Sequence, residues 1–168
     1  ILEFALDDKV IEIVTDYLGA LPRLSALGLQ YSPVNDTTVS SQMFHVDGDD
    51  FHQVKCFINI FEVGPDDGPL SFLPADTSKT VRAALRHGWR AGRLTDEQVF
   101  GECEEDKLVA VTGPPGSGVL LDTSACLHFG SRARRRPRLT LMCQYSPCPN
   151  LETDLWRFEQ EGSVLVRF

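Results

Sequence analysis

The feature that most constrains this fold is the texture of the chain from Thr37 onward, where short β-prone runs alternate with Gly, Pro and Asp. The candidate strands span Thr37–His45, Gln53–Val63, Pro69–Leu73, Lys107–Thr112, Ser117–Asp122, Cys126–Gly130, Arg138–Tyr145 and Val164–Phe168. Short strands separated by turn residues favour a sandwich or barrel over alternating βαβ units. We therefore predict a mainly β fold with a few flanking helices, an eight-stranded, cupin-like jelly roll (double-stranded β-helix).

Helical patterns occupy the remaining segments. Residues Asp7–Leu18 place apolar side chains at helical spacing, and Gly19 and Pro22 end the pattern. A second helix is expected over Thr77–His87, with Asp76 or Thr77 as its N-cap. Thr95 to Gln98 forms a capping box, the start of a third helix. A short helical stretch is also expected near Glu152–Gln160.

Size and charge limit the possible functions. The 168 residues fit a single domain, which we place over the whole chain, 1–168. A net charge of -8 argues against nucleic-acid or anionic-membrane partners, because both need a basic face. No apolar run approaches the roughly 20 residues that cross a bilayer. We expect a small-molecule substrate, and the sequence does not fix the oligomeric state.

The five cysteines show neither zinc-finger nor CxxC spacing. Cys56, Cys126 and Cys143 lie in apolar, strand-like runs, where a free thiol behaves as a small buried hydrophobe. This usage favours a reducing, intracellular compartment, and we expect a cytoplasmic protein. The chain begins at Ile1 without a Met, so targeting to an organelle by a preceding segment is an alternative that the sequence leaves open.

The sequence His45-Val46-Asp47, followed 83 residues later by His128, is a candidate metal site. Positions i and i+2 of an extended segment share a face, so His45 and Asp47 can bind one ion together. Two imidazoles and one carboxylate hold Fe(II) on one side and leave the other coordination positions open. The alternative is that both histidines belong to the core and that Asp47 caps a loop. Asp49 and Asp50 are competing carboxylates, which the i, i+2 parity disfavours.

Arg138 indicates what the open positions bind. It begins a β-prone run shortly after His128, where a guanidinium can be held in a fixed position. Such a group pairs bidentately with a carboxylate, and 2-oxoglutarate carries one at each end. We therefore expect Fe(II), 2-oxoglutarate as co-substrate, and O2. The other Arg residues of the run 131–138 are expected in a solvated loop, with a docking patch for an acidic substrate as the alternative.

Further co-substrate ligands are less constrained by the pattern. Lys55 and Asn59 lie on the polar face of a strand whose other face is apolar. They could bind a 2-oxoglutarate carboxylate if that face points into the barrel, or they could lie on a solvent-exposed edge. Gln42 and Ser131 are similar candidates.

These motifs together resemble the phytanoyl-CoA dioxygenase family. The likeness covers roughly residues 40 to 146 and consists of His45-Val46-Asp47, the segment 68–74 (GPLSFLP), the segment 118–122 (GVLLD) running into Leu127-His128, and Arg138. The resemblance implies a double-stranded β-helix with iron bound by His45, Asp47 and His128, and with 2-oxoglutarate anchored by Arg138. The chain departs from the family pattern after Pro74, where Ala75-Asp76-Thr77 replaces a Gly-Ser-His element.

The functional hypothesis is an Fe(II)- and 2-oxoglutarate-dependent dioxygenase that hydroxylates a small molecule and releases succinate and CO2. One rival is a catalytically silent jelly roll that binds a ligand or a partner in the same cavity. A second is a cupin-type metalloenzyme that does not use 2-oxoglutarate. The sequence does not indicate the substrate, because pocket-lining loops vary independently of the fold.

Overall fold

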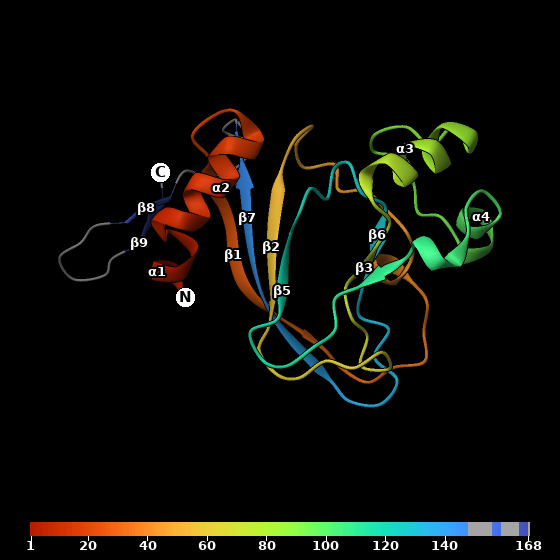
Figure 1. Cartoon of the computed structure of the whole chain (residues 1–168). Coiled ribbons are helices and arrows are strands. Elements are labelled where there is room, and N and C mark those ends of the chain that lie inside the picture. The colour runs from red at the N-terminus through yellow and green to blue at the C-terminus, as the bar shows by residue number, and fades with distance from the viewer. Residues whose placement is uncertain (148–155, 159–164, 168) are drawn as a thin grey trace.

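Two antiparallel sheets form the body of the protein in a computed structural model, which describes residues 1–147, 156–158 and 165–167. The larger sheet has the strand order β1-β7-β2-β5 and the smaller has the order β4-β3-β6. Their bounds are β1 Arg23–Ser32, β2 Val54–Asn59, β3 Ser71–Phe72, β4 Val109–Ala110, β5 Gly118–Leu121, β6 His128–Phe129 and β7 Arg138–Ser146. The two sheets stand opposite each other in Figure 1. The predicted mainly β class is confirmed.

Helices cover the outer side of each sheet (Figure 1). They are α1 Leu2–Ala5, α2 Asp8–Leu18, α3 Ala75–Ala84 and α4 Asp96–Phe100, with 3-10 turns η1 Ser40–Gln42 and η2 Glu105–Lys107. The α2 helix begins where the Asp7 carboxylate accepts from the backbone N–H of Lys9, and ends at Gly19 in the left-handed region. The predicted capping box is present in α4, where Thr95 and Gln98 bond reciprocally. None of the helices in the described part of the chain has the length and apolar character that a bilayer-spanning segment needs.

The hydrophobic cores lie outside the two sheets rather than only between them. Val14 and Leu18 of α2 pack on Cys56, Cys143 and Tyr145 of the larger sheet. A second core joins the smaller sheet to α3 and α4, and consists of Phe44, Val46, Leu73, Val81, Leu94, Val99, Leu127 and Phe129. Because these cores bury the outward-facing residues, the alternate residues of the strands point inward, toward the space between the sheets.

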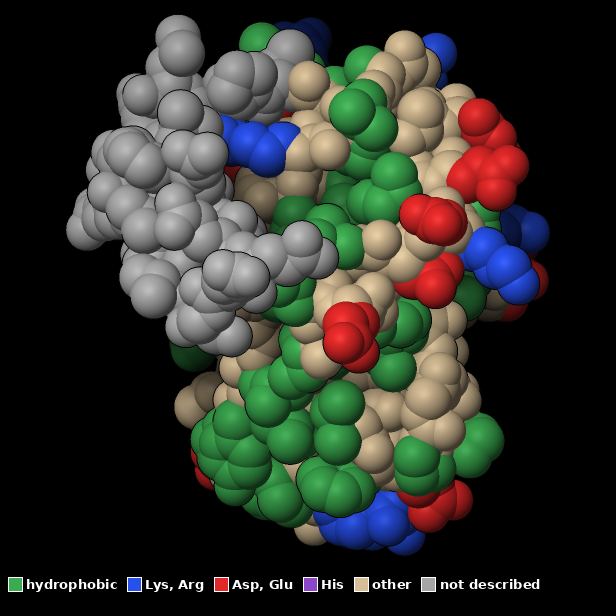
Figure 2. Space-filling model, turned by 90° about the vertical axis from the view of Figure 1, so that its left-hand side faces the viewer, with side chains coloured by type: hydrophobic (Ala, Val, Ile, Leu, Met, Phe, Trp, Pro, Cys, Tyr) green, Lys and Arg blue, Asp and Glu red, His purple; other side chains and the backbone are tan. Residues whose placement is uncertain are grey.

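The α1 and α2 helices cover only part of the larger sheet. Leu29 and Tyr31 on β1 are 52% and 66% exposed. Figure 2 views the molecule from the side of these helices and shows hydrophobic side chains gathered on the lower part of that face.

Several predicted elements differ from the observed ones. The segment 37–45 is not a strand, because η1 interrupts it and only isolated bridges at Phe44 and His45 remain. The α3 helix starts at Ala75 after Pro74, which has no side-chain cap, so neither Asp76 nor Thr77 is the N-cap. Strand β1 was not predicted at all. Of the helix expected near 152–160, only Trp156–Phe158 is described, and it is a strand (β8) paired with β9, Leu165–Arg167; the rest lies outside the described residues.

The Arg-rich run 131–138 is a loop with Arg134 and Arg135 exposed, as predicted, and several of its side chains also have partners within the protein. Arg132 forms a bidentate pair with Asp96 at 2.7 and 2.8 Å. Arg134 donates to the carbonyl of Asn35 at 2.7 Å. Arg135 and Arg136 both contact Asp67, which is almost fully buried. The run is therefore fixed to three neighbouring segments of the chain.

Asp67 is the centre of that anchorage. Its carboxylate accepts from the Gly64 backbone N–H at 2.8 Å and from Arg136 at 2.7 Å. These hydrogen bonds hold the pKa of Asp67 well below its usual value. Gly68 completes the turn: its φ is +69°, and the backbone of Arg132 and Ala133 leaves no room for a Cβ.

We expect Asp67→Asn to lower the free energy of unfolding, and Asp66→Asn, a change at an exposed neighbouring position, to leave it nearly unchanged. The native pKa of Asp67 is depressed, so its contribution is complete above about pH 4, the value for an unfolded Asp, and is lost as the pH falls toward the native pKa. Denaturant unfolding of both variants between neutral and acidic pH measures this. Equal effects of the two variants, or a pH-independent difference between wild type and Asp67→Asn, would contradict the assignment.

Candidate metal centre and co-substrate cavity

A backbone bridge brings His45 and His128 together, although they are 83 residues apart in the chain. The His45 N–H donates to the His128 carbonyl at 3.0 Å, and the His128 N–H donates back at 2.9 Å. Residues directly opposite in an antiparallel pair project to the same side. The two rings accordingly lie with their centroids 4.3 Å apart.

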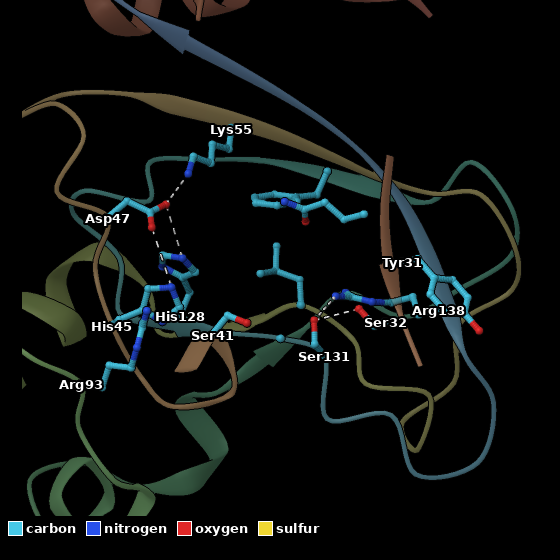
Figure 3. A pocket seen from close by; sticks show the side chains of 14 residues that line it. Tyr31, Ser32, Ser41, His45, Asp47, Lys55, Arg93, His128, Ser131 and Arg138 are labelled. Atoms are coloured by element: carbon cyan, nitrogen blue, oxygen red, sulfur yellow. Dashed lines mark hydrogen bonds and ion pairs between the residues drawn. The ribbon is translucent and has the colours of Figure 1, made fainter. Parts of the chain in front are cut away.

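Asp47 completes a three-residue cluster with the two imidazoles (Figure 3). Its Oδ1 lies 3.8 Å from His45 Nε2 and its Oδ2 lies 3.7 Å from His128 Nε2. The three ligand atoms all lie within 4.8 Å of one another. Two ligands at about 2.2 Å from one ion can be at most about 4.4 Å apart, so both carboxylate–imidazole separations suit a shared ion.

Backbone carbonyls fix the tautomers of both histidines. His45 Nδ1 lies 2.8 Å from the Met43 carbonyl and His128 Nδ1 lies 2.9 Å from the Cys126 carbonyl. A carbonyl can only accept, so each Nδ1 carries the proton and each Nε2 keeps its lone pair toward Asp47. Burial also lowers the pKa of His45, and that of His128 to about 4. Neutral, oriented imidazoles are what a metal ion requires.

Lys55 holds the carboxylate of the cluster. Its Nζ lies 2.7 Å from Asp47 Oδ2 and 3.5 Å from the more exposed carboxylate of Asp49. Burial raises the pKa of Asp47, but His128 and Lys55 more than offset this and hold it below the usual value. Lys55 therefore lies inside the cavity, as expected if the polar face of β2 points inward.

Arg138 opens strand β7 and is buried, with only 5% of the residue exposed. Nη2 donates to Ser131 Oγ at 3.3 Å, whereas the buried Nε has no partner in the described part of the chain. Burial lowers the pKa of Arg138 to about 10, so it stays charged at neutral pH. Gly130 leaves room for this group, because a Cβ there would lie 3.2 Å from Nη2.

One cavity of about 350 Å³ connects the cluster to Arg138 (Figure 3). Its further lining residues include Tyr31, Ser32, Ser41, Phe57, Leu70 and Arg93. The metal-ligand candidates lie at one end and the buried guanidinium at the other. An ion at the cluster and an anion at Arg138 would thus share the same enclosed space.

The predicted site residues divide into two groups. His45, Asp47, Lys55, His128, Ser131 and Arg138 all line the cavity. Asn59 instead donates to the Val111 carbonyl, and Gln42 bonds to Thr37, Asn35 and the Ser131 carbonyl. The structure does not bring these two amides to the cavity, because backbone and loop partners hold both.

Sequence reasoning missed the contributions of β1 and of Arg93. Ser32, paired with Arg138 across β1 and β7, lines the cavity beside it, and its hydroxyl lies 2.8 Å from that of Ser131. The alternation of β1 is weak and its residues are not β-branched, so little in its pattern marked a strand. Arg93 belongs to a segment, 77–95, with five Lys and Arg and no Asp or Glu, which is the signal that could have drawn attention to it.

No family model matches this sequence, and no curated protein matches it significantly. Solved structures do. EctD from S. alaskensis with bound Fe superposes with a TM-score of 0.63 at 20% identity, over 89% of this chain and 53% of EctD. HygX from Streptomyces hygroscopicus with nickel and 2-oxoglutarate bound superposes with a TM-score of 0.57 at 17% identity, over 99% of this chain and 73% of HygX.

AviO1 from Streptomyces viridochromogenes Tue57 also matches, with a TM-score of 0.55 at 13% identity, over 88% of this chain and 61% of AviO1. At these identities the likeness establishes the fold, and the chain spans about half the length of EctD. The cupin-like jelly roll predicted from the sequence is confirmed. The metals and 2-oxoglutarate in these structures are properties of those proteins.

Replacement of a cluster residue should abolish tight metal binding. We expect His128→Ala and Asp47→Ala each to weaken Mn(II) or Fe(II) binding by at least about 100-fold, more than the loss of an outer hydrogen-bond partner costs. Anaerobic titration calorimetry measures the affinity. His52→Ala is the matched control, because this half-exposed imidazole contacts Asp122 outside the cavity. Tight binding by His128→Ala, or equal weakening by His52→Ala, would rule out this metal site.

Proposed function

We propose that this chain is an Fe(II)- and 2-oxoglutarate-dependent oxygenase that hydroxylates a small organic molecule and releases succinate and CO2. The observation that carries the proposal is the joint presence, in one cavity, of the cluster His45–Asp47–His128 and the buried guanidinium of Arg138. Neither feature alone would be sufficient. A metal cluster serves many reactions, and a buried arginine can be structural.

The donor set fits iron. Two imidazoles and one carboxylate on one side of an ion leave positions for a co-substrate and O2. His45, Asp47 and His128 would hold the metal, and Fe(II) with 2-oxoglutarate and O2 supplies the oxidation of a substrate C–H bond. The halogenating relatives of such enzymes carry Ala or Gly in place of the carboxylate, so Asp47 favours hydroxylation.

The residues around the cluster position the reactants. Arg138 would pair with the far carboxylate of 2-oxoglutarate, using the Nε–H that has no partner among the described residues. Ser131 orients this guanidinium through its hydroxyl. Lys55 keeps Asp47 ionised and fixes one of its oxygens. Phe57 and Leu70 provide an apolar part of the cavity wall, which limits water around the reactants.

Arg138 also separates the proposal from its rivals. An unpartnered cation is costly to bury, so its retention calls for an anion that arrives with the ligand. In a metalloenzyme that does not use 2-oxoglutarate, the buried guanidinium of Arg138 would have no function. In a catalytically silent binding domain, the complete set of metal-ligand residues would have no function. Within the oxygenases, the order of the motifs favours the phytanoyl-CoA dioxygenase type, and we propose that assignment on the sequence resemblance.

We expect Arg138→Met to weaken 2-oxoglutarate binding by about 30-fold or more, because loss of one partner of a buried charge pair costs about 2–5 kcal/mol. Titration of the Mn(II)-loaded protein with 2-oxoglutarate measures this, and Mn(II) affinity should be unchanged. Arg138→Lys should be intermediate, since it keeps the charge but not the planar fork.

Arg134→Met is the matched control, because Arg134 donates to backbone carbonyls on the surface. It should bind 2-oxoglutarate like the wild type. The proposal fails if the metal-loaded wild-type chain does not bind 2-oxoglutarate, or if Arg138→Met binds it equally well.

A further inference from the structure

The cavity contains a second guanidinium, that of Arg93, which the proposed use of 2-oxoglutarate does not employ. Arg93 lines the cavity together with His45 and His128. Figure 3 shows it beside His45, at the other end of the cavity from Arg138. Within residues 1–147 it forms no ion pair or hydrogen bond with an acidic side chain, in contrast to Arg132, Arg135 and Arg136. Its charge is close enough to His45 to lower the pKa of that imidazole.

The charges that line the cavity leave a positive excess. Lys55 neutralises Asp47 at 2.7 Å, so two unpaired guanidinium groups remain, those of Arg138 and Arg93. A divalent metal and a 2-oxoglutarate dianion cancel each other in formal charge. The loaded cavity therefore keeps an excess of two positive charges, or of one if Asp49 beside Lys55 is included.

The two guanidinium groups differ in position and exposure. Arg138 is buried, and a co-substrate that extends from the metal through the cavity would reach it. Arg93 is an exposed residue on the loop that leads into α4, so it meets a molecule that enters from outside. A 2-oxoglutarate that binds the metal with one carboxylate and Arg138 with the other has no further carboxylate for Arg93. A different anion must therefore be the partner of Arg93.

On the basis of the proposed function, we infer that the substrate is an organic oxyanion, a carboxylate or a phosphate monoester, whose charged group pairs with Arg93. The planar fork of a guanidinium fits either group bidentately. The same pairing would place the remainder of the substrate in the cavity against Phe57 and Leu70, near the metal-ligand cluster. Arg93 is thus a substrate-binding residue that selects anionic over neutral and cationic molecules.

The surrounding segment supports an anionic ligand. Residues 77–95 contain Lys79, Arg82, Arg86, Arg90 and Arg93 but no acidic residue, in a chain whose net charge is -8. A local field of this sign favours anions near the segment. Lys79, Arg82 and Arg86 line a separate pocket, and Arg93 is the one of the five that lines the cavity. Asp76 and Asp96 flank the segment in the chain, and Asp96 is already paired with Arg132 at 2.7 Å.

The test uses matched probes on the chain loaded with Mn(II) and 2-oxoglutarate under anaerobic conditions. Hexanoate and hexyl phosphate are compared with hexanamide and hexylamine by calorimetry. We expect the oxyanions to bind at least about 10-fold more tightly than the amide or the amine, the scale of one charge-assisted hydrogen bond. The comparison of hexanoate with hexyl phosphate decides which of the two oxyanions the site prefers.

Arg93→Met should remove this preference without changing the affinity for 2-oxoglutarate, and Arg93→Glu should favour hexylamine. Arg86→Met is the matched control, because it removes one charge from the same basic segment but from a residue that does not line the cavity. It should keep the preference for oxyanions.

Each result is decisive. If hexanoate and hexyl phosphate bind no more tightly than hexanamide, the inference is wrong. The inference is also wrong if Arg93→Met weakens the binding of 2-oxoglutarate instead of the binding of the oxyanions, since Arg93 would then be a co-substrate ligand. Failure of the wild type to bind 2-oxoglutarate at all would reject the proposed function itself, which the preceding titration detects separately.

Discussion

The reciprocal backbone bridge between His45 and His128 is the contact on which the site depends. It pairs two residues that exchange both N–H···O bonds, so their side chains must project to the same side. Apolar packing decides which side that is. Phe44 and Val46 are buried in the outer core, where Phe44 packs edge-on against Phe129, and the alternate residues His45 and Asp47 therefore face the cavity. The hydrophobic residues that alternate with the ligands along the chain thus set the direction in which the ligands point.

The charged groups that line the cavity lower the stability of the empty protein, and the rest of the fold must offset this free energy. Four charged groups line it, and only Lys55 and Asp47 neutralise each other within ordinary ion-pair distance. Arg138 is buried with one long hydrogen bond and an unpartnered Nε. Such an arrangement destabilises the empty protein and favours a state in which anions are bound. This trade of stability for binding is typical of functional sites.

The sequence predicted the residues whose role depends on local parity and pattern. The His45–Asp47 spacing, the α4 capping box and the two faces of β2 all follow from periods of two or from short-range hydrogen bonding, and all appear in the structure. Strand β1 could not be found in this way. Its side chains pack well only because β7 lies beside it, a pairing across more than a hundred residues that no local pattern encodes. Gln42 and Asn59 were of a residue type that suits a ligand, but Gln42 bonds within its own loop and to Ser131, and Asn59 bonds to the distant Val111 carbonyl.

Charge alone likewise does not tell a structural arginine from a functional one. The run 131–138 contains five arginines, and its charge density left a docking surface open as the alternative to a solvated loop. In the structure, Arg132, Arg135 and Arg136 each have a carboxylate partner, so they serve to hold the loop against Asp96 and Asp67. Arg138 from the same run and Arg93 from another lack an acidic partner within residues 1–147, and both line the cavity. What separates the two groups is whether the fold itself supplies the anion, because a guanidinium already paired with a carboxylate has little left to offer a ligand.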